Sequence, residues 1–185
     1  MIKIKIIVLL GKSGSGKNVL CEYLQELGIQ KLVTHTTRKP RQGEINGVAY
    51  HFVTKEDFDK LNKIEQTEYA GDYYGLSRQE IEKCTSEISY IIMDYNGAKK
   101  IKENYNDTTI IYIHIDQEQQ EERLRKRGDS EDEIKKRINY SIQSDEVKND
   151  IEIADYIITN NDLEKSKQIL KYIVKDVLNE KVTVF

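Results

Sequence analysis

A glycine-rich stretch of eight residues, GKSGSGKN at positions 11–18, constrains the fold more than any other feature of this 185-residue chain. It follows the short apolar run Ile6–Leu10, and it precedes apolar residues at helical spacing that end before Gly28. A strand, a tight loop and a helix are the elements expected from this order. Because continuous apolar strands are typical of parallel sheets buried on both faces, the stretch predicts an α/β fold.

The chemistry of this loop favours binding of a nucleotide phosphate. Glycine lets the backbone wrap closely around an anion, so that several N–H groups and the N-terminus of the next helix point at a β-phosphate. Lys17 would place a positive charge near the transferred group. A turn that merely joins a strand to a helix is the alternative. The ATP-binding residues predicted here are Gly11, Lys12, Ser13, Gly14, Ser15, Gly16, Lys17 and Asn18.

Asn18 is the unusual residue of the loop. Ser or Thr usually follows the lysine in this pattern, and its hydroxyl helps to hold Mg²⁺. The amide oxygen of Asn18 could coordinate the ion or hold a metal-bound water, but it is neutral and lies on a longer side chain. We therefore expect Mg²⁺ as the cofactor that accompanies ATP, with Asn18 as a weak or water-mediated ligand.

The alternation of strands and helices continues along the chain but is interrupted twice. Apolar runs predict strands at Ile88–Met93, Thr109–Ile115 and Tyr156–Thr159, and a short one near Lys31–Val33. A helix over 163–178 would bury Ile169, Leu170, Ile173, Val174, Val177 and Leu178 on one face. The interruptions, at about 34–80 and 125–150, carry their own charges and predict a substrate cover and a lid.

The sequence thus predicts one α/β domain over residues 1–185, with a parallel-sheet core formed by 1–33, 81–124 and 151–185 and flanked by helices. Thr54 and Ser130 begin capping-box patterns, and the second is expected to start a helix that runs to about Asp150. Turns are expected around Gly71 and Gly75.

Composition limits the possible partners. The formal net charge of −3 arises from 29 basic and 32 acidic residues, so no overall field favours nucleic acid or an anionic membrane. No stretch approaches the roughly 20 apolar residues that cross a bilayer. The two cysteines, Cys21 and Cys84, lie far apart and are expected to be reduced structural thiols. A cytoplasmic protein without nucleic-acid or membrane partners is therefore expected.

A second cluster of phosphate-binding chemistry lies at positions 34–50. Arg38 and Arg41 supply guanidiniums, and Thr34 and Tyr50 supply hydroxyls, a combination suited to a dianionic phosphate monoester. This segment, TTRKPRQGEINGVAYHFV, resembles the GMP-binding segment of guanylate kinases. The resemblance continues in family order through EYAGDYYG, IIMDYNGA, RLRKRGDSEDEIKKR and IITNNDL, and so covers nearly the whole chain.

The resemblance implies a P-loop nucleoside monophosphate kinase with inserted GMP-binding and lid subdomains, which moves the γ-phosphate of ATP to GMP or dGMP with Mg²⁺. The GMP-binding residues that it implies are Thr34, Arg38, Arg41, Tyr50, Glu68, Tyr74 and Asp94, where the family usually has serine at the first position. Of these, Glu68 and Asp94 would face the guanine. Guanine presents two adjacent N–H donors that one carboxylate can accept, whereas adenine would leave that carboxylate unpaired.

The lid segment supplies arginines for the transferred phosphoryl group. Arg123, Arg127 and Arg137 are the lid residues, and the last two match the family's catalytic arginines. With Lys17 and Arg41 they form the expected catalytic set. Asn160 matches a family asparagine near the ATP base, although an ordinary helix start explains it equally well.

Four departures from the family pattern indicate a divergent member. Besides Asn18, Leu76 stands where a hydroxyl usually touches the guanine, Ile92 replaces an acidic residue, and the lid is one residue short between Arg127 and Arg137. Relaxed base selectivity and weakened Mg²⁺ affinity are expected.

Two other functions remain open at this point. Asn18 is similar to the acidic residue that follows the lysine in kinases acting on ribose bisphosphate, but those kinases lack the RxPRxGExNG signature seen here. A non-catalytic guanylate-kinase-like binding module is the third possibility, although such modules generally lose the lysine or the GMP-site residues.

Overall fold

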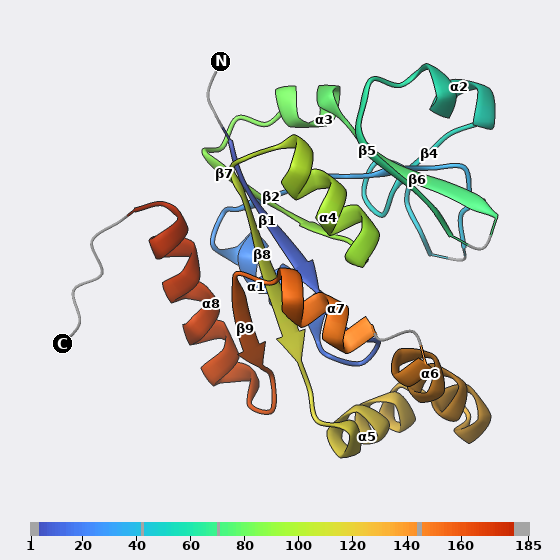
Figure 1. Ribbon diagram of the computed structural model, residues 1–185, viewed down its shortest axis with the longest axis vertical. Coiled ribbons are helices and arrows are strands. Elements are labelled where there is room, and N and C mark those ends of the chain that lie inside the picture. Colours follow the sequence, from blue (N-terminus) through green and yellow to red (C-terminus); the bar gives the residue numbers. More distant parts are fainter. Residues whose placement is uncertain (1–3, 42, 70, 144–145, 180–185) are drawn as a thin grey trace.

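A parallel sheet of five strands forms the centre of the molecule (Figure 1). The computed structural model describes residues 4–41, 43–69, 71–143 and 146–179. The strand order is β2 (Gln30–Lys31), β7 (Ile88–Ile92), β1 (Lys5–Leu10), β8 (Thr108–His114) and β9 (Tyr156–Thr159). Every neighbouring pair in this sheet is parallel, which confirms the predicted α/β class.

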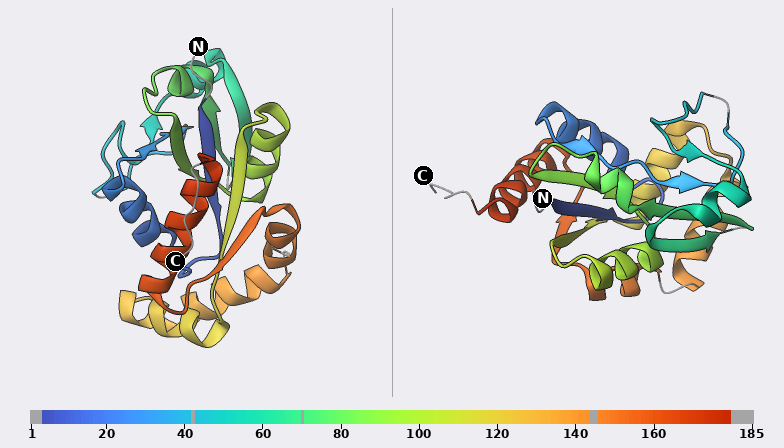
Figure 2. Two further views of the ribbon diagram at one scale, coloured as in Figure 1. Left: turned by 90° about the vertical axis from the view of Figure 1, so that its left-hand side faces the viewer. Right: turned by 90° about the horizontal axis from the view of Figure 1, so that it is seen from above.

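The central strand β1 is buried on both faces, and its alternating side chains enter two separate cores. Ile6, Val8 and Leu10 pack in the cluster that includes α4 (Tyr95–Asn104) and α7 (Glu146–Ile153). Ile7 and Leu9 pack on the opposite face, against α1 (Lys17–Glu26) and α8 (Leu163–Val177). Figure 2 shows the sheet lying between these two layers of helices. The period of two along a strand explains why one apolar run serves both cores.

A second, mostly antiparallel sheet lies beside α4, with which β5 is in contact. Its order is β4 (His51–Phe52), β3 (His35–Thr36), β6 (Asp72–Ser77) and β5 (Lys63–Tyr69), and it carries α2 (Lys55–Lys60) and α3 (Arg78–Glu82). All four strands fall within the segment 34–80 that interrupts the core pattern. β2 ends two residues earlier than expected because the chain leaves the main sheet for this one.

The turn predicted at Gly71 is present, but the prediction of a turn at Gly75 is wrong. Gly71 has a φ of +83° between β5 and β6, a conformation that favours glycine. Gly75 lies inside β6 instead, where a Cβ atom would stand 2.9 Å from the carbonyl oxygen of Glu65. The residue is small because two strands approach closely there, not because the chain turns.

Two helix predictions also need correction. The Ser130 capping box is present, since Glu133 accepts from the backbone N–H of Ser130 at 2.9 Å, but the helix it begins is α6 (Glu131–Gln143), followed by the separate helix α7. Residues 144–145, between them, lie outside the described part of the chain. On α8, Ile169 is 43% exposed, whereas Leu170 and Ile173 are buried as expected. The apolar stripe of α8 is therefore narrower than predicted.

The strands of the main sheet all point the same way, so their carboxyl ends meet at one edge. The glycine-rich loop follows β1 there, α5 (Gln117–Arg127) follows β8, and Asn160 follows β9. Ligands of open α/β sheets bind in the crevice at this edge. No helix among the described residues is both long and apolar enough to pass through a lipid bilayer.

Candidate active site

The glycine-rich loop adopts a conformation that only glycine permits at three positions. Gly11, Gly14 and Gly16 have φ values of +142°, +83° and +90°. A Cβ atom on Gly11 would lie 2.5 Å from the carbonyl oxygen of Ile113, and one on Gly16 would overlap the side chain of Asn160. The backbone thus wraps tightly against β8 and the residue that follows β9, in the kind of glycine-rich turn whose N–H groups can bind an anion.

Side chains from the other side of the site hold this loop in place. The Nδ2 of Asn160 donates to the Ser15 carbonyl oxygen at 2.8 Å, and Gln120 donates to the Ser13 carbonyl oxygen at 2.8 Å. Arg123 donates to the carbonyl oxygens of Asn160 at 2.6 Å and Ser15 at 3.4 Å. The structure therefore places Asn160 and Arg123 as supports of the loop. Gln120 plays the same part, and no local sequence pattern marks it.

Lys17 lies at the start of α1, with its ammonium folded back over the loop. Its Nζ donates to the carbonyl oxygens of Gly11 and, at 3.0 Å, of Lys12. These two carbonyl oxygens hold the Lys17 ammonium against the loop. When a nucleotide binds, its phosphate oxygens can replace them as hydrogen-bond acceptors. Asn18, one residue later, has an exposed side chain. Ser15 Oγ and Asn160 Oδ1 are buried and find no hydrogen-bond partner among the described residues.

The predicted lid arginines behave differently from one another. Arg137 of α6 reaches the loop and donates to the hydroxyl of Ser13 at 3.3 Å. Arg127, at the end of α5, is half exposed and pairs with Asp129. The structure thus brings Arg137 to the phosphate loop and leaves Arg127 paired with Asp129, a carboxylate that an incoming phosphate could replace.

A cavity of about 680 Å³ is lined by residues of the second sheet and its loops and of the helices α4, α6 and α7. All seven residues predicted to bind GMP line it, namely Thr34, Arg38, Arg41, Tyr50, Glu68, Tyr74 and Asp94. Glu44, Glu65, Thr67, Ile92, Met93, Tyr95, Asn96, Gly97, Tyr140 and Asn149 complete the lining. The structure therefore gathers the predicted acceptor site from segments up to 60 positions apart.

Part of the cavity lining is basic, and it is ordered by Glu44, a residue of the RxPRxGExNG signature to which the sequence assigned no role. Glu44 accepts two bonds from the Arg38 guanidinium, at 2.8 and 3.0 Å, and one from the Arg41 backbone N–H at 2.7 Å. The hydrogen bond to Glu44 raises the pKa of Arg38 above its ordinary value. Arg38 also lies 5.4 Å above the ring of Tyr50. These contacts fix the guanidinium plane, which favours two-point binding of a phosphate.

The cavity is also lined by a buried carboxylate, and it is Glu65 rather than Glu68. Glu65 is 5% exposed and its Oε1 accepts from the Leu76 backbone N–H at 2.8 Å. Burial raises the pKa of Glu65 to about 7, and the charge of Asp94 adds to the shift. Glu68 lines the cavity as predicted, but its side chain is exposed to solvent. An exposed carboxylate loses little when it is unpaired, so burial makes Glu65 the better group to distinguish bases.

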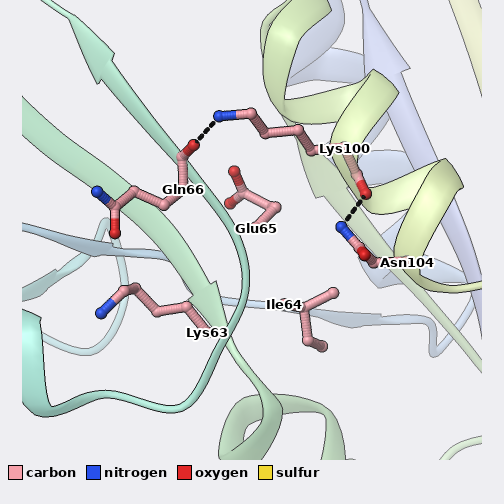
Figure 3. Close-up of a pocket in the computed structure, with 6 residues that line it drawn as sticks. All are labelled: Lys63, Ile64, Glu65, Gln66, Lys100 and Asn104. Carbon is pink, nitrogen blue, oxygen red and sulfur yellow. Dashed lines mark hydrogen bonds between the residues drawn. The ribbon is translucent and has the colours of Figure 1, made fainter.

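A strand irregularity explains how Glu65 comes to be buried. The pairing of β5 with β6 shifts register between Lys63 and Glu65, so that Ile64 and Glu65 are buried in succession. Glu65 also lines a second cavity of about 400 Å³, together with Lys100 and Asn104 of α4. Figure 3 shows the Glu65 carboxylate pointing toward the region between Gln66 and the Lys100 side chain, away from Asn104. Lys100 donates to the carbonyl oxygen of Gln66, which ties β5 to α4. The carboxylate is thus held in a rigid wall between the two cavities.

Three further residues singled out in the sequence lie near Glu65. They are Asp94 and the two residues that depart from the family pattern, Leu76 and Ile92. Asp94 begins α4, where its Oδ1 accepts from the Gly97 N–H at 2.8 Å. Leu76 is fully buried in the core, so it offers the site only its backbone. Ile92 lines the cavity and also packs against the core beneath α1 and α8. The carboxylates of Glu65 and Asp94 therefore lack a hydroxyl neighbour at position 76.

The fold and the loop define a class: α/β proteins that bind nucleotide phosphates at a glycine loop after the central strand and carry a second basic cavity for an acceptor. The family model described as guanylate kinase matches residues 3–177. The chain therefore belongs to the guanylate kinase family.

Individual relatives agree with this assignment. A guanylate kinase of Helicobacter pylori is 38% identical over 185 residues, covering 94% of this chain and 88% of the relative. A guanylate kinase of Synechocystis is 37% identical, covering 89% of this chain and 90% of the relative. The crystal structure of guanylate kinase from Anaplasma phagocytophilum has a TM-score of 0.67 at 27% identity, and the match covers 98% of this chain and 89% of that one.

Proposed function

We propose that this chain catalyses transfer of the γ-phosphate of ATP to GMP or dGMP, giving the nucleoside diphosphate. The observation that carries the proposal is that one cavity is lined by two arginines and a buried carboxylate, and that helix α6, which borders it, also contacts the glycine-rich loop through Arg137. A bare sugar phosphate offers no base to the buried Glu65, whose carboxylate would keep only the hydrogen bond from the Leu76 N–H, and this disfavours a ribose bisphosphate kinase. The presence of Lys17, Arg38, Arg41 and Arg137 disfavours a non-catalytic module.

The acceptor phosphate would bind at the basic part of the cavity lining. Arg38, held flat by Glu44, and Arg41 would pair with its oxygens, and Thr34, Tyr50 and Tyr74 lie on the same cavity wall. No general base is needed, because the attacking phosphate oxygen is already anionic near neutral pH. The protein's task is to orient this oxygen in line with the donor and to compensate the charge of the transferred group.

The guanine base would be recognised by Glu65, with Asp94 beside it. An ionised Glu65 can accept the two adjacent N–H donors of guanine while it keeps the N–H of Leu76. Adenine presents an acceptor at the corresponding ring nitrogen and would leave the carboxylate unpaired. We therefore place at Glu65 the role that the sequence comparison assigned to Glu68.

The donor side would be formed by the loop and the lid. Lys17 and the loop N–H groups would bind the β- and γ-phosphates, and Arg137 already lies against Ser13 of that loop. Arg127 would join once it leaves Asp129. We propose that the core bounded by 1–33, 81–124 and 151–185 is rigid, whereas 34–80 and 125–150 close over the substrates and exclude water. Residues 1–3, 42, 70, 144–145 and 180–185 of these ranges lie outside the described part of the chain.

Mg²⁺ would be held chiefly by ATP itself. Among the described residues, no group of three or more His, Cys, Asp or Glu side chains could form a metal site, and Ile92 offers no oxygen at the cavity edge. The Asn18 amide oxygen is the protein ligand that the loop provides, and Mg²⁺ readily keeps several waters and substrate phosphates in its shell. When bound, the ion would neutralise charge on the β- and γ-phosphates. The donor set fits Mg²⁺, but weakly.

Asn18→Thr is expected to increase the apparent affinity of the enzyme for Mg²⁺. A hydroxyl in place of the amide should lower the Mg²⁺ concentration for half-maximal rate by about threefold to tenfold, because it supplies a shorter ligand in the usual geometry. The measurement is ATP-to-GMP transfer across a magnesium titration in wild type and variant. Absence of GDP at every magnesium concentration in the wild type would overturn the proposed function, and an unchanged midpoint in Asn18→Thr would overturn the role of Asn18.

The activity is expected to fall in acid because Glu65 must be ionised to bind guanine. Its folded pKa of about 7 lies above the ordinary value of 4.5, so the carboxylate is protonated and loses its second acceptor as the pH drops through 7. Below that point kcat/KM for GMP should fall by up to about tenfold per pH unit. The same profile in Glu65→Gln controls for titration of the GMP phosphate, and equal profiles would contradict the assignment.

A further inference from the structure

The acceptor cavity is lined in part by residues that neither the phosphate-binding nor the base-binding part of the proposed GMP site uses. Tyr140 of α6 and Asn149 of α7 both line it. Tyr140 is 56% exposed and Asn149 is half-buried, so both side chains are accessible to a molecule in the cavity. Both residues come from the segment proposed as the lid, whereas the phosphate-binding and base-binding groups come from the second sheet, the loop between β3 and β4, and the start of α4.

Helix α6 is oriented so that one of its faces serves two sites. Its buried residues Ile134 and Ile138 pack on Leu124 of α5, which fixes the rotation of the helix. Arg137 and Tyr140 are three positions apart and so lie next to each other on its surface. Arg137 reaches the phosphate loop, and Tyr140 faces the acceptor cavity. Helix α6 therefore contacts the phosphate loop through Arg137 and borders the acceptor cavity through Tyr140.

The chemistry of these two side chains fits a nucleoside. A tyrosine ring offers an apolar face to a sugar or a base, and its hydroxyl can donate or accept a hydrogen bond. The Asn149 amide can also donate and accept. Neither group carries a charge, so neither competes with the arginines for the phosphate. What remains for them to contact is the part of the acceptor between its phosphate and the edge of the base read by Glu65.

We propose that Tyr140 and Asn149 bind the nucleoside part of the acceptor nucleotide, so that the lid contributes to acceptor binding as well as to phosphoryl transfer. This inference rests on the proposed function, since it takes GMP as the occupant of the cavity. It goes further in assigning a substrate contact to the lid face of α6 and α7. A lid residue that contacts the acceptor also makes closure of Arg137 more favourable when the acceptor is present.

The test is a comparison of Tyr140→Ala with Tyr172→Ala. Tyr172 lies on α8, is 57% exposed and does not line the cavity, so it controls for loss of an exposed tyrosine. Tyr140→Ala should raise KM for GMP by about tenfold, while KM for ATP stays within about twofold. Asn149→Ala should shift KM for GMP in the same direction, and Tyr172→Ala should leave both constants unchanged. Thermal unfolding of each variant reports any loss of folding.

The outcomes separate the two claims. If the wild type transfers phosphate to GMP and Tyr140→Ala leaves KM for GMP unchanged, or raises both KM values equally, the nucleoside contact is wrong and the proposed function stands. If the wild type forms no GDP, the proposed function is wrong and this inference is overturned with it. A rise in KM for GMP alone in Tyr140→Ala, with a smaller rise in Tyr140→Phe, supports contact by the ring, because phenylalanine keeps the ring and loses only the hydroxyl.

Discussion

Replacement of Arg137 by alanine is expected to lower kcat for phosphoryl transfer by about a thousandfold. Arg137 lies 3.3 Å from the Ser13 hydroxyl of the phosphate loop, and so stands where negative charge redistributes in the transition state. Because this charge is greater in the transition state than in the bound substrates, the loss should appear in kcat and far less in KM. The measurement is steady-state turnover with ATP and GMP both saturating.

Neighbouring substitutions make this prediction specific. Lys136→Ala removes an exposed cation from the adjacent position of α6 and should change kcat by less than about twofold, because its charge is solvated. Arg137→Lys keeps the charge but not the planar fork, and it should recover only part of the rate. Equal rates in Arg137→Ala and the wild type would contradict a role for this arginine in the transition state.

Replacement of Glu65 by glutamine is expected to lower kcat/KM for GMP by about a hundredfold. The amide oxygen can still accept from the Leu76 N–H, but the NH₂ group now faces the N–H donors of guanine. This juxtaposition removes an acceptor and adds a repulsive donor, a loss that converts to about 2.7 kcal/mol of transition-state binding. The measurement is kcat/KM for GMP and AMP in the variant and the wild type.

Glu68→Gln is the matched control for this substitution. It makes the same chemical change three residues away on the same strand, at an exposed carboxylate that lines the same cavity. We expect less than about a twofold change, because an exposed group exchanges its partners for water. A large loss in Glu68→Gln with no loss in Glu65→Gln would return guanine recognition to Glu68.

The fold was predictable because its signals are local. The apolar strands, the glycine loop and the basic segment around Arg38 and Arg41 each lie within a short stretch of sequence, and the structure places them as the patterns indicate. The period of two along β1 and the glycines of the loop depend on backbone geometry, which sequence reports directly.

The remaining features depend on contacts between distant segments. Glu65 is buried by a register shift in β5, which breaks the alternation that would mark an inward position. Gln120 and Arg123 support the phosphate loop from α5 over more than 100 positions, and their own helix gives no sign of it. The separation of α6 from α7 was also not predicted, because the continuous polar sequence up to about Asp150 indicated a single helix.

The acceptor preference of the purified wild-type protein tests the central claim most directly. Rates of ADP formation from ATP and Mg²⁺ are compared with GMP, dGMP, AMP, CMP, UMP and ribose 5-phosphate as acceptors. The structure predicts turnover with GMP and dGMP, and a kcat/KM for GMP at least about a hundredfold above that for AMP, because only guanine satisfies the buried Glu65. Equal use of GMP and AMP, or turnover with the sugar phosphate alone, would contradict it.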